Sequence, residues 1–393
     1  MSDRPANHYV SDEPYDAEAD LQILDRSDLD APTWVLVWRR FRRHKVGVAC
    51  FAFLAFCYLM LPFVEMLTPY LPNTIHEDDI FAPPQGLYWF HEGEYIGLHT
   101  YATETRYNPE TGLIDYFEHR DTPLPVPVLT TCAEAYTDDP MVNPLIAPFE
   151  GRFRLICPPK DGQLFLLGSD RLGRDVLSRI IYGARLSLTI GLIGVTVSFV
   201  IGMVLGGMAG YFGGWIDATV QRLIEIFRSL PELPIWLALS AAVPVNWNSL
   251  SVFVMISIIL GLLDWPGLAR AVRSKFLGLR EEDYVRAAEL MGAKPRRIIS
   301  AHMMPNFMSH LIASASLSIP AMILGETALS FLGFGIRSPS VSWGLMLNDA
   351  LKQNLGALEL YPWILAPMIP VILVVLAFSF LGDALRDALD PYS

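Results

Sequence analysis

The sequence is short of charge, and of positive charge in particular. Only 18% of its 393 residues are charged, and 29 lysines and arginines stand against 41 aspartates and glutamates, for a formal net charge of −12. A protein that neutralises nucleic-acid phosphates needs a basic surface, which this excess of acid argues against. We therefore expect no nucleic-acid partner.

Motifs of common catalytic chemistry are missing from the sequence as well. It has no GxxxxGK[ST] phosphate loop and no HExxH, GxSxG or CxxC motif. His302 and His310 lie eight residues apart rather than the four that bring two imidazoles to one metal. We expect no catalytic residue, no metal site and no cofactor bound by this chain.

The first thirty residues lack the plan of a cleaved signal peptide, and they are acidic. We expect residues 1–45 to form a cytoplasmic tail that ends in an amphipathic helix, "PTWVLVWRRFRRHK", lying on the inner membrane surface.

Apolar residues, by contrast, are abundant at 52%, above the usual share in soluble domains. A helix of about twenty residues crosses the hydrocarbon of a bilayer. Six segments approach that length, and they predict spans near Val46–Leu67, Leu186–Met208, Ile216–Val243, Leu250–Arg270, Phe307–Phe334 and Pro362–Leu381. Charged residues occupy the first half of the third segment, so its spanning part should start near Pro231.

Basic residues next to short loops set the orientation, because such loops tend to stay in the cytoplasm. They precede the first span as "RRFRRHK" and crowd the loop between the fourth and fifth spans. The sequence therefore predicts an all-α polytopic membrane protein with six transmembrane helices, the first at 46–67, and with both termini in the cytoplasm.

Residues 68–165 separate the first two spans, and we expect them to form an extracytoplasmic inserted domain. Their many aromatic residues favour a small packed domain over disorder. Cys132 and Cys157 lie in this segment, where an oxidising compartment allows a disulfide, and two free thiols are the alternative.

Two features inside the spans bear on helix packing. Ser198, Gly202 and Gly206 recur every four residues in the second span, a spacing that lets another helix approach closely, although glycine also marks an ordinary flexible helix. Glu326 lies about 28 Å along the fifth span, near the outer interface. Helix packing or a polar contact to a neighbouring subunit is its expected role, and contact with a substrate in the pathway is the alternative.

A polar helix pair is expected in the basic loop at 271–306. Tyr284, Ala287, Ala288 and Met291 share one face at helical spacing, while Arg286 points elsewhere. Gly292 can end this helix in a left-handed conformation, and Pro295 suits the first turn of the next, which runs to Pro305. A DNA-reading helix-turn-helix has a similar turn, but spans on both sides leave it little room to reach a groove.

This loop resembles the cytoplasmic signature of the permease subunits of binding-protein-dependent ABC importers, in the oligopeptide, dipeptide and nickel branch. Ala287, Ala288, Gly292 and Pro305 match the signature in register, and Arg286 stands where that family has glutamate, so it is a candidate for a contact peculiar to this chain. The stretches "LLGSDRLGRDVLSRIIYGARLSLTIGL", "LSFLGFG" and "GDALRDALDP" resemble the same branch.

The resemblance implies a type I importer permease fold for residues 166–393, in the cell inner membrane. It implies a second, homologous permease chain and a periplasmic or lipid-anchored substrate-binding protein. Two ATPase subunits would carry ATP and Mg, and each would receive one coupling helix, here Tyr284–Lys294. Peptides are the leading substrate class, with nickel, opines and short sugars also transported in this branch.

The alternative is a membrane-anchored enzyme with its active site in the extracytoplasmic domain, where acidic residues could act as acid and base or bind Ca²⁺. Those acids lack metal-loop spacing, and an enzyme would not need the cytoplasmic helix pair. An exporter or a channel would share the spans without the family signatures.

Overall fold

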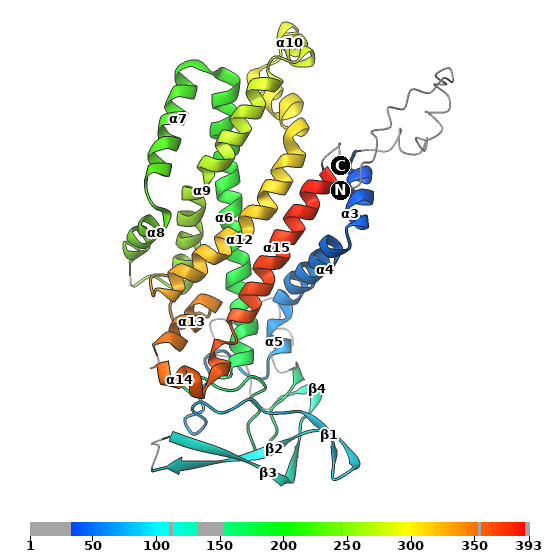
Figure 1. Ribbon diagram of the computed structural model, residues 1–393, viewed down its shortest axis with the longest axis vertical. Coiled ribbons are helices and arrows are strands. Elements are labelled where there is room, and N and C mark those ends of the chain that lie inside the picture. Colours follow the sequence, from blue (N-terminus) through cyan, green and yellow to red (C-terminus); the bar gives the residue numbers. More distant parts are fainter. Residues whose placement is uncertain (1–32, 110–112, 133–152, 245, 353–354, 390–393) are drawn as a thin grey trace, which may run out of the picture.

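The computed structural model describes residues 33–109, 113–132, 153–244, 246–352 and 355–389. Long helices form a bundle, and two small β-sheets lie at one end of it (Figure 1). The described part of the chain is therefore mostly helical, as expected, but it is not all-α.

Five helical segments are long and apolar enough to cross a membrane. They correspond to the first, second, fourth, fifth and sixth predicted spans. They are α4 (Lys45–Met60) with η1 (Leu61–Phe63) and α5 (Val64–Leu67), α6 (Val176–Phe212), α9 (Ser249–Leu279), α12 (Met308–Phe331), and η5 (Pro362–Leu365) with α15 (Met368–Leu389). The amphipathic helix α3 (Thr33–Arg43) precedes α4, as its sequence predicts.

The predicted third span, Ile216–Val243, is divided between two helices. α7 (Gly214–Ser229) ends before a break at Leu230, and α8 (Glu232–Ala241) begins directly after Pro231. Leu230 is extended because the proline ring that follows it disfavours the helical conformation. A helix begins beside Pro231, where the spanning part was expected to start, but neither helix alone has the length that a span needs.

Small residues let α6 and α9 pack closely. Ser198, Gly202 and Gly206 are all buried, which confirms their predicted packing role. A Cβ atom on Gly206 would lie 2.4 Å from the carbonyl oxygen of Ala269 in α9. At this point the two helices touch through their backbones, so only glycine fits.

The inserted segment contains strands that the sequence analysis did not predict. β1 (Tyr88–His91), β2 (Glu94–Asn108) and β3 (Leu113–Pro125) form one antiparallel sheet in that order, and β4 (Val128–Thr131) pairs with β5 (Phe153–Ile156). A small core of Tyr70, Ala82 and Phe165, with Tyr116 of β3 packed against it, lies within this segment.

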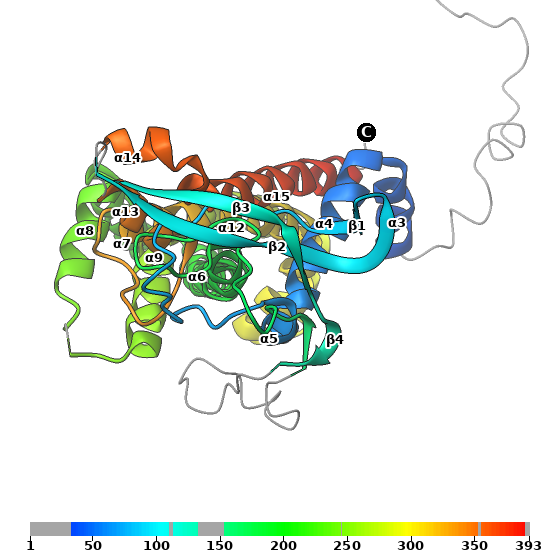
Figure 2. The ribbon, with the colours of Figure 1, turned by 90° about the horizontal axis from the view of Figure 1, so that it is seen from below.

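Different elements lie at the two ends of the bundle. α3, the end of α15 and the loop that contains α10 (Asp283–Leu290) lie at one end, and the sheets, α13 (Trp343–Leu351) and α14 (Leu355–Leu360) lie at the other (Figure 1). Seen from below, the three-stranded sheet runs across the end of the bundle (Figure 2).

Candidate functional site

The loop between α9 and α12 folds as the predicted helix, turn and second helix. α10 ends just before Gly292, whose φ is +78°. The Gly292 N–H donates to the Glu289 carbonyl at 2.9 Å, and the Ala293 N–H donates to the Ala288 carbonyl at 3.0 Å. This pair of hydrogen bonds is the Schellman motif, which requires a left-handed residue at this position, so the predicted role of Gly292 as a helix end is confirmed.

Pro295 is the first residue of the second helix, as predicted. The missing N–H of proline costs nothing there, because that group has no partner in the first turn of a helix. This helix is irregular: α11 (Pro295–Arg297) continues as a π-helix, η3 (Ile298–Met303), and then as a 3₁₀ turn, η4 (Pro305–Phe307). The chain enters α12 without a flexible linker.

One side of α10 is buried against the rest of the chain. Val285 and Ala288 are 0% and 3% exposed. They pack in an apolar cluster with residues from the end of α9 and from η3, among them Phe276, Ile298 and Met303. The predicted face that groups Ala288 with Tyr284, Ala287 and Met291 is therefore wrong, because packing against these neighbouring elements buries Ala288.

The opposite side of α10 is open. Leu290 is 90% exposed and Met291 is 82% exposed, and Ala287 and Tyr284 are exposed as well. We call Ala287, Leu290 and Met291 the α10 tip. Leu290 was not among the predicted site residues, although a leucine just before the helix-ending glycine of a polar helix was a usable signal.

Two side-chain hydrogen bonds fix α10 to the bundle. The Tyr211 hydroxyl, in the last turn of α6, donates to Glu289 Oε1 at 2.9 Å. Asn306 Nδ2, in η4, donates to the Tyr284 hydroxyl at 2.8 Å. α10 therefore has polar ties to the element before α12 and to α6, in addition to its apolar contacts.

Arg286 points into solvent and forms an ion pair with Glu281 of the same chain. The two side chains are 57% and 64% exposed, so the pair contributes little to stability. The guanidinium keeps most of its surface open beside the α10 tip.

Glu326 lies inside the chain rather than on its surface. Its side chain is 0% exposed, and it accepts hydrogen bonds from Ser330 Oγ at 2.7 Å and from Ser187 Oγ, in α6, at 3.4 Å. The Ser187 hydroxyl also accepts the Trp343 N–H of α13 at 3.2 Å. These contacts join α12, α6 and α13, and they leave Glu326 no surface for another subunit or a substrate.

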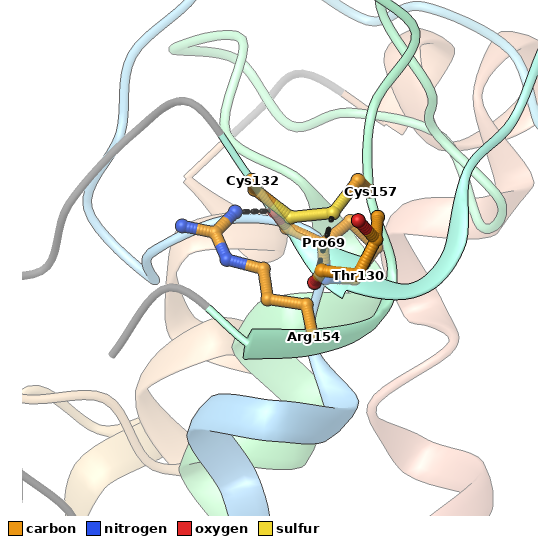
Figure 3. Close-up of a disulfide and its surroundings, with 5 residues drawn as sticks. All are labelled: Pro69, Thr130, Cys132, Arg154 and Cys157. Atoms are coloured by element: carbon orange, nitrogen blue, oxygen red, sulfur yellow. Dashed lines mark hydrogen bonds between the residues drawn. A yellow bond between two sulfur atoms is a disulfide. The ribbon is translucent and has the colours of Figure 1, made fainter. Parts of the chain in front are cut away.

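A disulfide joins Cys132 and Cys157, with a Cα–Cα distance of 5.7 Å (Figure 3). It lies beside the β4–β5 pair, where Cys157 Sγ is 3.7 Å from the Thr130 carbonyl. Arg154 reaches from β5 to the carbonyl of Pro69, just beyond α5. The sheet is thus tied to the end of the first span.

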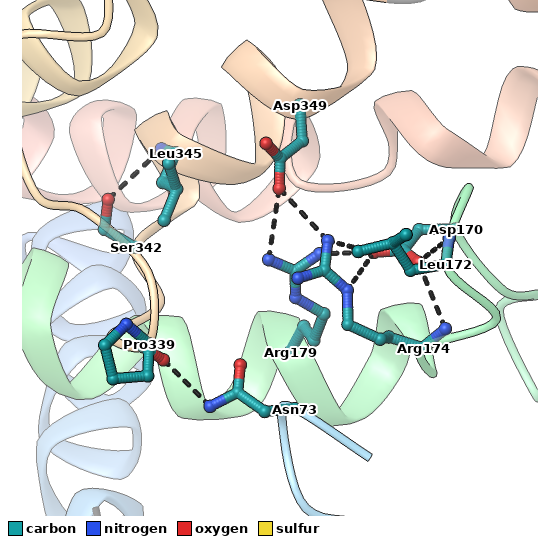
Figure 4. A network of polar contacts seen from close by, with 9 residues as sticks. All are labelled: Asn73, Asp170, Leu172, Arg174, Arg179, Pro339, Ser342, Leu345 and Asp349. Carbon is teal, nitrogen blue, oxygen red and sulfur yellow. Dashed lines mark hydrogen bonds and ion pairs between the residues drawn. The ribbon is translucent and has the colours of Figure 1, made fainter. Parts of the chain in front are cut away.

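A buried ion network at the sheet end was not predicted. Arg174 donates to Asp170 through Nε at 2.8 Å and to Asp349, in α13, through Nη2 at 3.1 Å (Figure 4). Arg179 pairs with the same two carboxylates. Although burial opposes it, the two guanidinium groups hold the pKa of Asp170 below its usual value. Two positive and two negative groups lock the start of α6 to α13.

Among the described residues, no group of three or more His, Cys, Asp or Glu side chains could hold a metal ion. This holds for the acidic residues of the inserted segment that the structure describes.

Two family models match the chain. "Binding-protein-dependent transport system inner membrane component" matches residues 202–392, and "N-terminal TM domain of oligopeptide transport permease C" matches residues 33–84. Residues 85–201, between the two matches, contain all five strands described above.

Characterised relatives agree with these matches. The dipeptide transport system permease protein DppC of Bacillus subtilis is 40% identical over 235 residues, which is 60% of this chain and 70% of that protein. The oligopeptide transport system permease protein OppC of Haemophilus influenzae is 39% identical over 235 residues, 60% of this chain and 72% of that protein. A chain of the inward-facing methionine ABC transporter MetNI aligns with a TM-score of 0.42 and 17% identity, over 54% of this chain and 96% of that chain.

The apolar helices and these matches define a multi-pass inner-membrane transport subunit. The chain belongs to the family of permease components of binding-protein-dependent ABC importers. In such importers the ATPase activity resides in partner subunits, so the chain is not itself an enzyme. The named relatives give no support to the alternative of a membrane-anchored enzyme.

Proposed function

We propose that this chain and a second, homologous permease form the pathway of an importer for peptides. The observation that carries the proposal is the identity of about two residues in five with dipeptide and oligopeptide permeases, over most of the length of those proteins. Two ATPase subunits with bound ATP and Mg, and a periplasmic or lipid-anchored binding protein, complete the importer.

The proposed topology has six crossings. α7 and α8 together return the chain from the α10 end of the bundle to the start of α9, so the broken pair takes the place of one span (Figure 1). Lysines and arginines around α10 support a cytoplasmic position for that end. Residues 68–165 then form a domain outside the inner membrane, and residues 166–393 form the permease core.

The α10 tip is proposed as the knob that enters a groove of the ATPase, with Arg286 at its edge. A largely exposed leucine and methionine on a short helix are the apolar anchors that such a groove would bury. α10 is held to α6 and η4 by hydrogen bonds and to α9 by packing. A push on the tip would therefore move spans as rigid bodies, which is how alternating access is produced.

For the inserted domain we propose docking of the binding protein or capping of the pathway. The three-stranded sheet runs across the bundle end that faces away from α10, where delivered substrate would arrive (Figure 2). Deletion of this domain should lower uptake or the affinity for the binding protein. Unchanged values of both would refute the role.

The coupling role is tested with Gly292→Pro in proteoliposomes that hold the complete importer. Proline fixes φ near −65°, which is incompatible with the +78° found here. Peptide uptake should be lost while the chain still inserts and co-purifies with the second permease. The matched control is Gly278→Ala, because a methyl group there meets nothing within 4 Å. Normal uptake by Gly292→Pro would count against the coupling role.

A further inference from the structure

A carboxylate lies halfway along α9. Asp264 is fifteen residues from each end of the helix, Ser249 and Leu279, which is about 22 Å in either direction. Its side chain is exposed on the surface of this chain, and it accepts a hydrogen bond from Ser198 Oγ, in α6, at 3.1 Å. A charged group at this depth is costly in contact with lipid and is expected to face a bundle interior or a water-filled cavity.

The break between α7 and α8 lies beside Asp264. Leu230 and Pro231 are not helical, and both are exposed. Backbone that leaves the helix at membrane depth is tolerated only where protein buries it or where it lines a water-filled cavity. This argument is independent of the charge on Asp264, and it leads to the same conclusion: this face of the chain does not meet lipid.

A pocket of about 100 Å³ opens between the break and α9. Its charged lining consists of Arg228 from α7, Glu232 from α8 and Asp264 from α9. Two carboxylates and one guanidinium leave an excess of one negative charge. The pocket therefore favours a cation that can donate hydrogen bonds over an anion or a neutral group.

We infer that Asp264 and Glu232 bind the α-ammonium group of a peptide as it passes through the pathway. The inference rests on the proposed function, which supplies a substrate with that group. An α-ammonium presents N–H donors and one positive charge, which match the two carboxylates and the net charge of the pocket. A lysine or arginine of the second permease would satisfy the same carboxylates, and the experiment separates it from the substrate.

The experiment uses proteoliposomes that contain this chain, the second permease and both ATPases, with the binding protein and a radiolabelled dipeptide. Asp264→Asn should lower uptake roughly tenfold or more through loss of a charge-assisted hydrogen bond, and Glu232→Gln should lower it as well. The control is Glu225→Gln, which removes an exposed carboxylate of α7 that pairs with Arg222 at 2.9 Å outside the pocket. Its uptake should stay at the wild-type level.

A dipeptide with a free amino group and a diazirine side chain then locates the site. Wild-type complexes should carry crosslinks on residues 227–235 or 263–267, and Asp264→Asn complexes should lose them. Crosslinks elsewhere with normal dipeptide uptake would overturn the inference and leave the proposed function standing. Failure of Asp264→Asn to co-purify with the second permease would also overturn it, since Asp264 would then pair with that chain. A wild-type complex that takes up no dipeptide would refute the proposed substrate and the inference together.

Discussion

The Tyr211 hydroxyl of α6 donates a 2.9 Å hydrogen bond to Glu289 Oε1 of α10. It is a direct polar contact between the longest apolar helix of the described chain and the exposed helix at its end. A hydrogen bond to a charged group is stronger than a neutral one, so this contact is suited to carry a displacement of α10 into α6.

Tyr211→Phe should therefore reduce transport without preventing assembly. Loss of the hydrogen bond, worth about 1.5 kcal/mol or more, should lower uptake per ATP hydrolysed roughly tenfold. Glu289→Ala should have a similar effect, and the double variant should be no worse than either single one, because both remove the same contact. Uptake and ATPase rates in proteoliposomes provide the measurement. Additive effects would show that the two side chains act separately.

Ala287 is exposed and the adjacent Ala288 is buried, so substitutions at these two positions of α10 distinguish docking of the ATPase from folding of the loop. Ala288→Asp should destabilise the loop by about 3 kcal/mol or more, because it buries an unpaired charge in an apolar cluster. Ala287→Asp should leave the thermal unfolding midpoint within about 2 °C and weaken only the binding of the ATPase.

Thermal unfolding in detergent and co-purification of the ATPase measure the two effects. Equal loss of stability in both variants would contradict the assigned faces. Full ATPase binding by Ala287→Asp would remove the α10 tip from the interface.

Local signals predicted correctly the turn between α10 and the second helix of the α9–α12 loop. Which face of α10 is buried depends instead on contacts with other elements, and no local signal contains these. Gly292 and Pro295 could be placed because a left-handed helix end and a first helical turn are set by a few neighbouring residues. The burial of Ala288 depends on Phe276 and Ile298 from other elements, so helical spacing alone cannot supply it.

Other features of the structure were not predicted either. Arg179 and Asp349 are 170 residues apart in the chain, so nothing local indicates their pairing. For the third span, the sequence predicted a start near Pro231 but not that α7 and α8 are each too short to cross a membrane alone. The strands were not predicted because the aromatic residues of 88–107, a residue type that is enriched in strands, were taken only as a sign of a packed domain.

Asp175, the N-cap of α6, should make stability depend on pH. Burial raises its pKa to about 6, although it accepts the Ser178 N–H at 2.8 Å. A folded-state pKa above the unfolded value favours the folded chain fully below about pH 4, and this contribution of about 3 kcal/mol is lost as the pH rises through 6. Asp175→Asn keeps a capping oxygen and cannot ionise, so it should remove this pH dependence.

Thermal unfolding of the purified chain between pH 4.5 and 7.5 tests this prediction. The unfolding midpoint of Asp175→Asn should rise relative to the wild type as the pH increases. Asp161→Asn, at an exposed position before α6, is the control and should run parallel to the wild type. Parallel curves for Asp175→Asn would contradict the assignment.

Gly206→Ala should separate α6 from α9. The added methyl group would lie 2.4 Å from the Ala269 carbonyl oxygen, and backbone on both helices leaves it no room to move. Overpacking of this kind costs about 1 to 3 kcal/mol. Gly267→Ala in α9 is the control, since its methyl group would meet nothing within 4 Å. Thermal unfolding in detergent should show a lower midpoint for Gly206→Ala alone, and equal midpoints would contradict the close contact.

Cys132 and Cys157 should be oxidised in cells if residues 68–165 lie outside the inner membrane. In a Cys50→Ser, Cys57→Ser background, which removes both thiols of α4, a membrane-impermeant maleimide should label this chain only after reduction. The bridge spans 25 residues, so replacing both cysteines with serine should cost about 3 kcal/mol through the freedom that it returns to the unfolded chain. Labelling that is the same before and after reduction would contradict the disulfide. No labelling even after reduction of intact cells would instead contradict the outer position of the domain.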